Sequence, residues 1–269
     1  MQAETDASGT QPGAPGPGVP PPSARVALFL DIDGTLVHHA DHPGAVAIDA
    51  ALHAMLARLA QATDGALALI SGRAIADIDA LFAPSRFAVA GQHGTERRSA
   101  DGRLHYHAPL TARLHGVAEQ LRRLVQEHPG LLLEEKGASL ALHYRNAPEA
   151  AGLVAREMQR VLAGLGEEFE LQAGKFVCEV KPGGKDKGTA IAEFMAEAPF
   201  AGRRPVFVGD DLTDELGFDL VNRTGGDTVK VGPGPTCARW RLANADAVRD
   251  WLSDFASAAA GAAARGAAP

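Results

Sequence analysis

Three short, continuous apolar runs constrain the fold of this 269-residue chain more than any other feature. They are RVALFLD (25–31), GALALIS (65–71) and RPVFVGD (204–210), and each ends in a polar residue. Runs of this length and composition are typical of strands that are buried on both faces. Apolar residues at helical spacing lie between the first two runs, and TDELGFDLVNR after the third predicts a helix with Thr213 as its N-cap. Strands that alternate with helices predict an α/β fold with a doubly wound, Rossmann-like parallel sheet.

The middle of the chain has a different pattern. A helix pattern near 114–124 precedes LLLEEKGASLALHYR, which predicts two strands around a turn at Gly137. A second helix pattern near 154–162 and the strand KFVCEVK follow. We therefore expect an α+β domain, the cap, inserted into the parallel domain, the core. The predicted organisation is a disordered Pro/Gly-rich tail (1–24), the first part of the core (25–103), the cap (104–182), the second part of the core (183–255) and an Ala-rich tail (256–269).

Composition excludes several classes of partner. The formal net charge is -7, so the chain has no broad basic surface, and nucleic acid is not an expected partner. No apolar run reaches the roughly 18 residues of a membrane span, and the N-terminus does not resemble a signal peptide. Cys178 and Cys237 lie far apart without CxxC spacing, which favours a reducing cytoplasm over a disulfide framework. We expect a cytoplasmic monomer that binds a small molecule.

Polar clusters follow the predicted buried strands or begin the helices after them. They are Asp31 and Asp33; Ser71; Lys187 in GKDKG; and Asp210, Asp211 and Asp214 in GDDLTDE. Taken singly, each is ordinary, since such residues are common in turns, at N-caps and on solvated surfaces. In a parallel sheet, however, ligands bind at the carboxyl ends of the strands. Clustered carboxylates at the end of a buried strand repel one another, so we expect a hard cation among them.

In order and type, these clusters resemble the four motifs of the haloacid dehalogenase (HAD) superfamily, mostly phosphatases that act through an aspartyl phosphate. The resemblance implies Asp31 as nucleophile and Asp33 as general acid and base. It implies Mg²⁺ held by the Asp31 side chain, the Asp33 backbone carbonyl and Asp210. The remaining motif residues have supporting roles: Asp211 and Asp214 are direct or supporting metal ligands, and Thr35, Ser71 and Lys187 bind the phosphoryl oxygens.

Longer segments resemble the bacterial trehalose-6-phosphate phosphatase family between about Leu28 and Trp251. They are ALALISGR, AGQHGTERR, LEEKGASLALHYR, CEVKPGGKDKG and PVFVGDDLTDELGF. The resemblance implies that Glu134, Lys136 and Glu179 bind the sugar. Alternation places Glu134 and Lys136 on one face of a strand, although charges on one strand face are often only its solvated side. Arg73, His93 and Arg145 lie in matching segments and are further candidates whose roles stay open, because Arg73 could equally form a salt bridge and Arg145 could close the cap sheet.

The resemblance implies magnesium-dependent hydrolysis of trehalose 6-phosphate to trehalose and phosphate. The alternatives are a phosphatase of another sugar phosphate, such as sucrose or glucosylglycerol phosphate, a phosphoacceptor signalling domain, and a silent sugar-binding module. The signalling domain needs neither Asp33 nor a cap, and a silent module has no reason to keep four charged groups clustered. The histidine-rich stretch HHADH (38–42) lacks partner ligands at metal spacing, and we interpret it as a solvated loop.

Overall fold

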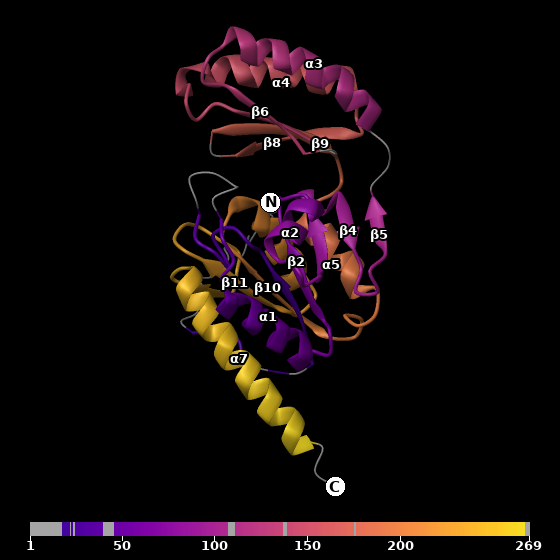
Figure 1. The fold of residues 1–269 in the computed structure, drawn as a ribbon, viewed down its shortest axis with the longest axis vertical. Helices are drawn as coiled ribbons and strands as arrows, with labels where there is room; N and C mark the ends of the chain where they lie inside the picture. The colour runs from indigo at the N-terminus through magenta and orange to yellow at the C-terminus, as the bar shows by residue number, and fades with distance from the viewer. Residues whose placement is uncertain are drawn as a thin grey trace, which may run out of the picture.

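The computed structural model describes residues 18–21, 23, 25–39, 46–106, 111–136, 139–174 and 176–266. They form two units, each built on its own sheet (Figure 1). The core contains the large sheet, and the cap contains a smaller sheet with its helices α3 and α4 on the side away from the core. The predicted turn at Gly137 lies outside the described residues.

An eight-stranded sheet forms the core, in the order β12-β11-β10-β1-β2-β3-β4-β5. Its strands are β1 (Val26–Leu30), β2 (Leu67–Ile70), β3 (Ala88–Gly91), β4 (Glu96–Arg98), β5 (Leu104–Tyr106), β10 (Arg204–Gly209), β11 (Asp227–Val231) and β12 (Trp240–Leu242). The run from β12 to β3 is parallel, which confirms the predicted α/β class. The three apolar runs noted above form β1, β2 and β10, and β1 lies between the other two.

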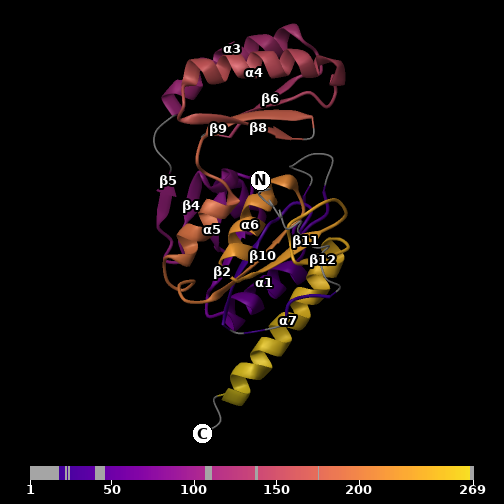
Figure 2. The ribbon, with the colours of Figure 1, turned by 180° about the vertical axis from the view of Figure 1, so that it is seen from behind.

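Helices cover both faces of the core sheet. They are α1 (Ala50–Ala62), α2 (Ile75–Leu81), α5 (Lys187–Met195), α6 (Glu215–Arg223) and α7 (Ala245–Gly266), with the 3₁₀ turns η2 (Gln92–Gly94) and η4 (Leu212–Asp214). Alternate residues of β1 divide between two apolar clusters: Leu28 packs with α1, α2 and α7, while Phe29 packs with α5 and α6. This burial on both faces explains why the strands are continuous apolar runs. The view from behind shows α5 and α6 against the opposite face from α1 and α7 (Figure 2).

Three boundaries differ from the sequence-based expectations. β4 and β5 extend the core sheet in antiparallel pairing, so the core continues to Tyr106 and the segment from 104 to 106 is not part of the cap. The expected tail from 256 begins inside α7, which continues to Gly266, as the high helix propensity of alanine allows. Thr213 is not an N-cap, because it lies within η4, where its backbone N–H donates to the Asp211 side chain.

The cap packs a four-stranded antiparallel sheet, in the order β6-β7-β9-β8, against two helices. Its elements are α3 (Thr111–Glu127), β6 (Leu132–Glu135), β7 (Leu140–His143), η3 (Pro148–Ala150), α4 (Ala151–Leu165), β8 (Phe169–Gly174) and β9 (Val177–Pro182). Leu140, Leu142 and Val180 point into the apolar cluster with the helices. The alternate residues of the sheet therefore face the core. No helix among the described residues is long and apolar enough to cross a membrane.

Candidate active site

The candidate site is assembled at the carboxyl ends of three adjacent parallel strands. Asp31 follows β1, Ser71 follows β2 and Asp210 follows β10. Lys187 is the first residue of α5, which begins with a capping box formed by Asp186 and Thr189. The fold thus brings together residues that are far apart in the sequence, because β1 pairs with β2 on one side and with β10 on the other.

Lys187 is buried between two carboxylates. Its Nζ lies 2.8 Å from Asp31 Oδ1 and 2.7 Å from Asp214 Oδ1, and all three side chains are at most 5% exposed. Burial alone would lower the pKa of Lys187, but Asp214 and Asp31 outweigh it and raise that pKa well above its usual value. Burial raises the pKa of Asp31 to about 7 and that of Asp214 to about 8, although Lys187 lowers both. The single positive charge of Lys187 therefore does not neutralise the two carboxylates of Asp31 and Asp214.

The acidic cluster fits a metal ion. Oxygens of Asp31, Asp210 and Asp214 lie within 4.8 Å of one another. Asp31 Oδ2 is buried and has no hydrogen-bond partner among the described residues, a costly state that a bound cation would relieve. Burial and the neighbouring carboxylates of Asp214 and Asp211 also raise the pKa of Asp210. An acidic cluster suited to a cation is therefore present where the sequence predicted one.

Asp214 and Asp211 have distinct surroundings. Asp214 Oδ2 accepts the backbone N–H groups of Asp210 and Asp211, at 2.9 and 3.0 Å, so Asp214 holds the loop that carries both. Asp211 is half-exposed and accepts hydrogen bonds from the backbone N–H and the hydroxyl of Thr213. Burial opposes ionisation of Asp211, but Lys187 and Thr213 outweigh it and lower its pKa to about 2.

Asp31 and Asp33 are held by different cations. Arg73 donates from Nε and Nη2 to the two oxygens of Asp33, whereas Asp31 contacts Lys187. Gly34 follows with a φ of 86°, and a Cβ at this position would overlap Asp210 Oδ2, so the turn requires glycine. The salt bridge left open for Arg73 by the sequence therefore forms with Asp33.

Two hydroxyls lie at the same end of the sheet. Thr35 is fully buried, and its Oγ1 is 3.5 Å from Asp210 Oδ1. Ser71 is also buried, and its Oγ accepts the backbone N–H of Arg73, which leaves the hydroxyl proton available to a ligand.

His93 joins the site from η2. Its backbone N–H donates to the Ser71 carbonyl, and its φ of 55° lies in the left-handed region that non-glycine residues rarely adopt. Its Nδ1 is buried and finds no hydrogen-bond partner in the part of the chain that the structure describes. Burial, followed by the charge of Lys187, lowers the pKa of His93 to about 4, so the imidazole is neutral at pH 7. Backbone strain and an unpaired buried nitrogen both mark functional sites.

Sequence reasoning missed His39. Its Nε2 lies 2.9 Å from Asp210 Oδ2, so the start of the histidine-rich stretch contacts the acidic cluster although the ring is largely exposed. Residues 40–45, including His42, lie outside the described part. The contact joins residues 171 positions apart, and no local spacing indicates it.

The cap presents a polar row to the core. Glu134 pairs with Ala141, Ala141 with Glu179, and Glu179 with Gln172, so these four positions share one face of the sheet. The fold therefore brings Glu134 and Glu179 onto one surface, where Lys136 lies 3.0 Å from Glu179 and 3.9 Å from Glu134. Arg145 is exposed in the turn after β7 and is not on this strand row.

The three cap residues predicted to bind sugar are tied to one another. Glu179 accepts from Ser139 Oγ at 2.6 Å as well as from Lys136. Burial works against ionisation of Glu179, but the charge of Lys136 and the hydrogen bond from Ser139 outweigh it and lower its pKa. The His143 ring, which sequence reasoning did not single out, lies 2.9 Å from Glu134.

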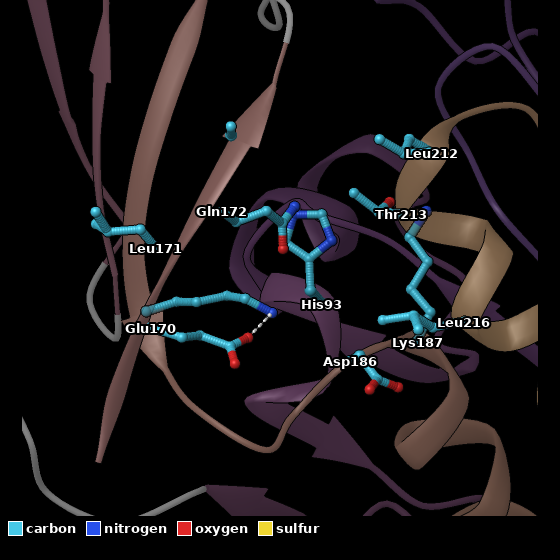
Figure 3. Close-up of a pocket in the computed structure, with 11 residues that line it drawn as sticks. His93, Glu170, Leu171, Gln172, Asp186, Lys187, Leu212, Thr213 and Leu216 are labelled. Carbon is cyan, nitrogen blue, oxygen red and sulfur yellow. Dashed lines mark ion pairs between the residues drawn. The ribbon is translucent and has the colours of Figure 1, made fainter. Parts of the chain in front are cut away.

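A cavity of about 260 Å³ connects the two units. His93, Lys187 and Leu212 line it from the core, and Glu170 and Gln172 line it from the cap (Figure 3). Gln172 and His93 point into the same space in this view, while the Leu171 side chain points away from it. The cavity is bounded by groups suited to phosphate on one side and to hydroxyls on the other.

Comparison with known proteins gives consistent matches. The family model described as trehalose-phosphatase matches residues 29–245. The trehalose-6-phosphate phosphatase of Escherichia coli (strain K12) is 48% identical over 237 residues, which are 88% of each chain. A crystal structure of a trehalose-6-phosphate phosphatase related protein superposes with a TM-score of 0.76 at 25% identity, covering 88% of this chain and 99% of that one. A haloacid dehalogenase-like hydrolase from B. subtilis shares the fold, with a TM-score of 0.60 at 14% identity, covering 85% of this chain and 98% of that one.

Proposed function

This chain belongs to the trehalose-phosphatase family, and we propose that it hydrolyses trehalose 6-phosphate to trehalose and inorganic phosphate. The family resemblance inferred from the sequence is confirmed. One observation carries the proposal: Lys187 binds the buried Asp31 and also lines a cavity whose other wall is the polar face of the cap. A phosphoryl group at Lys187 would thus have a carboxylate nucleophile beside it and hydroxyl-binding groups beyond it.

In the proposed reaction, an oxygen of Asp31 attacks phosphorus and the bond from phosphorus to the sugar oxygen breaks. Asp33 donates a proton to that oxygen as trehalose leaves. Asp33 then takes a proton from the water that hydrolyses the phosphoryl group from Asp31. Lys187, Thr35 and Ser71 hold the equatorial phosphoryl oxygens through their ammonium and hydroxyl groups.

We propose Mg²⁺ as the cation of the acidic cluster. Asp31, Asp210 and the backbone carbonyl of Asp33 would hold it, and Asp214 would support them through the loop that it binds. When bound, the ion supplies the charge that keeps the clustered carboxylates ionised and reduces their repulsion of phosphate. Asp211 would lie outside this set, because it does not belong to the group of carboxylates whose oxygens lie within 4.8 Å of one another.

For the cap, we propose that Glu134, Lys136 and Glu179 bind hydroxyls of the sugar. Their present contacts with one another and with Ser139 and His143 keep them oriented toward the core. Hydroxyls of the substrate would replace or share these hydrogen bonds. The free-energy cost of burying and orienting the three charged side chains is then met during folding and does not weaken substrate binding. A cytoplasmic location and a monomeric state stay as predictions beside this proposal.

The test is phosphate release from trehalose 6-phosphate, glucose 6-phosphate and sucrose 6-phosphate, with and without Mg²⁺, by the native chain and by Asp31→Asn. Fast, Mg²⁺-dependent release from the trehalose ester, absent in Asp31→Asn, is the expected result. Equal release from all three esters would support a phosphatase of broader substrate range. No release from any ester would favour the silent sugar-binding module.

A further inference from the structure

The strand β8 adds a residue to the polar face of the cap. Gln172 lies directly opposite Glu179 in the β8–β9 pair, and Glu179 is in line with Glu134 through Ala141. Directly paired residues project from the same face of a sheet, so Gln172 faces the core with the two glutamates. In Figure 3, its carboxamide extends into the cavity that His93 lines from the core.

Gln172 differs from Glu134 and Glu179 because its side-chain amide has no hydrogen-bond partner among the described residues. Both oxygens of Glu179 are bound, one by Lys136 and one by Ser139, and Glu134 contacts His143. The half-buried Gln172 side chain, by contrast, forms no hydrogen bond or ion pair with any described residue. One carbonyl acceptor and two N–H donors therefore remain for a ligand in the cavity.

The cavity around Gln172 suits a sugar. The exposed Leu212 and Leu216 line it from the core side and offer apolar surface to the C–H groups of a sugar ring. Lys187, where the phosphoryl group is expected, lines the core wall of the cavity, and Gln172 lines the opposite wall, which belongs to the cap (Figure 3). A ligand that has its phosphate at Lys187 crosses the cavity to reach Gln172, so the part of the ligand that meets Gln172 is remote from the phosphate.

We propose that Gln172 is a specificity-determining residue that binds hydroxyls of the sugar ring remote from the phosphate, so that a disaccharide phosphate is preferred over a monosaccharide phosphate. An amide suits this task because it accepts a hydrogen bond from one hydroxyl and donates to its neighbour. The inference rests on the proposed function and assigns a further residue to the same site.

The experiment compares Gln172→Leu, which keeps the side-chain size but removes both kinds of hydrogen-bonding group, with the native enzyme. Gln126→Leu is the matched control, because Gln126 is an exposed residue of the cap helix α3. Initial rates are measured with trehalose 6-phosphate, glucose 6-phosphate and p-nitrophenyl phosphate. We expect Gln172→Leu to lower kcat/KM for trehalose 6-phosphate about tenfold, chiefly through KM, and to change the other two less than about twofold.

Binding gives a second measurement that does not depend on turnover. Trehalose 6-phosphate is titrated calorimetrically into Asp31→Asn and into Asp31→Asn/Gln172→Leu, and a Kd about ten times weaker in the double variant is expected. An unchanged kcat/KM for trehalose 6-phosphate, an equal loss on all three esters, or an unchanged Kd would overturn the proposal for Gln172.

Different results would refute the proposed substrate and the proposed role of Gln172. If the native enzyme prefers sucrose 6-phosphate, the substrate of the proposed function is wrong. Repeating the comparison with that disaccharide ester then still tests Gln172. If the native enzyme prefers glucose 6-phosphate or shows no preference, discrimination by Gln172 is refuted as well. The melting temperature of Gln172→Leu, measured beside Gln126→Leu, verifies that the cap remains folded.

Discussion

Arg73 holds Asp33 through two parallel hydrogen bonds, from Nε to Oδ2 at 2.6 Å and from Nη2 to Oδ1 at 2.7 Å. This forked geometry is the strongest arrangement available to an arginine and a carboxylate. The hydrogen bonds to Asp33 raise the pKa of Arg73. Three negative charges raise this pKa further, those of Asp33, Asp77 and the cap residue Glu134. The pair therefore positions the proposed general acid and also lies within electrostatic reach of the cap. It must loosen before Asp33 can hold the proton that it donates.

A leaving-group comparison tests this role. Arg73→Met removes the fork, and we expect a first turnover of trehalose 6-phosphate slower by about tenfold or more, because general acid catalysis contributes about 10²- to 10⁴-fold. The first turnover of p-nitrophenyl phosphate, whose leaving group needs no proton, should change little. Rapid-quench measurements of both esters separate the effects, and Arg73→Lys is the charge-preserving control. Equal slowing of the two first turnovers would instead assign Arg73 to phosphate binding.

Mg²⁺ should stabilise the protein more at high pH than at low pH. Burial raises the pKa of Asp31 to about 7, and Asp210 and Asp211 add to the rise against the effect of Lys187. The folded state then keeps a proton that the unfolded state loses above pH 4. Without a divalent cation, Asp31 therefore lowers the free energy of unfolding as the pH rises from about 4 to about 7.

A cation that favours the ionised carboxylates reverses this loss, so the increase in melting temperature caused by Mg²⁺ should be larger at pH 8 than at pH 5. Thermal denaturation with Mg²⁺ and with EDTA measures it, and Asp31→Asn should lose most of the increase. The same increase at both pH values, in the native chain and the variant alike, would show that Mg²⁺ binds elsewhere.

Asp214→Ala should destabilise the fold strongly. The fully buried carboxylate binds Lys187 and two backbone N–H groups, and its removal leaves a buried ammonium with one fewer partner and two unpaired donors. Breaking a buried pair from one side costs about 3–5 kcal/mol. Urea denaturation measures the loss, and Asp214→Asn, which keeps the acceptor oxygen, should lose less. If Asp214→Ala is as stable as the native chain but inactive, Asp214 contributes to the chemistry and not to the loop.

His93 should make stability depend on pH below neutrality. Burial and Lys187 lower its pKa to about 4, so between about pH 4 and 6.5 the unfolded state binds a proton that the folded state does not. The free energy of unfolding then falls as the pH falls through this range, by about 3 kcal/mol at most from this group. His93→Asn removes the titration, and asparagine tolerates the positive φ. Urea denaturation at pH 4.5 and 7 should give a native-minus-variant difference that is larger at pH 7; a constant difference would contradict the assignment.

The strands that could be predicted from the sequence are those that are buried on both faces of the sheet. β1, β2 and β10 pack helices on both faces, so their sequences are continuous apolar runs that can be recognised without a structure. The short β4 contains charged residues, and its place in the sheet depends on pairing with β3. Pairing with a neighbouring strand leaves no pattern in the local sequence from which β4 could be predicted. Strand β8 could have been found, because Phe169, Leu171 and Ala173 alternate with Glu170 and Gln172.

The candidate site divides in the same way. The acidic residues follow strands, and parallel strands end at one edge, so their proximity could be inferred from the chain. The contacts of His39 with Asp210 and of Arg73 with Asp33 join loops on different strands. Which partner each finds is decided by the course of the backbone in three dimensions, and charge and spacing alone do not specify it.

The position of β1 between β2 and β10 also bears on synthesis of the protein. When Asp31 leaves the ribosome, the strand that covers one side of β1 and the lysine that binds its carboxylate have not yet been made, because the whole cap is translated first. The N-terminal half of the core must therefore wait with an exposed, aggregation-prone edge until β10 emerges. We expect translation through the cap to be the interval in which this nascent chain most needs a chaperone.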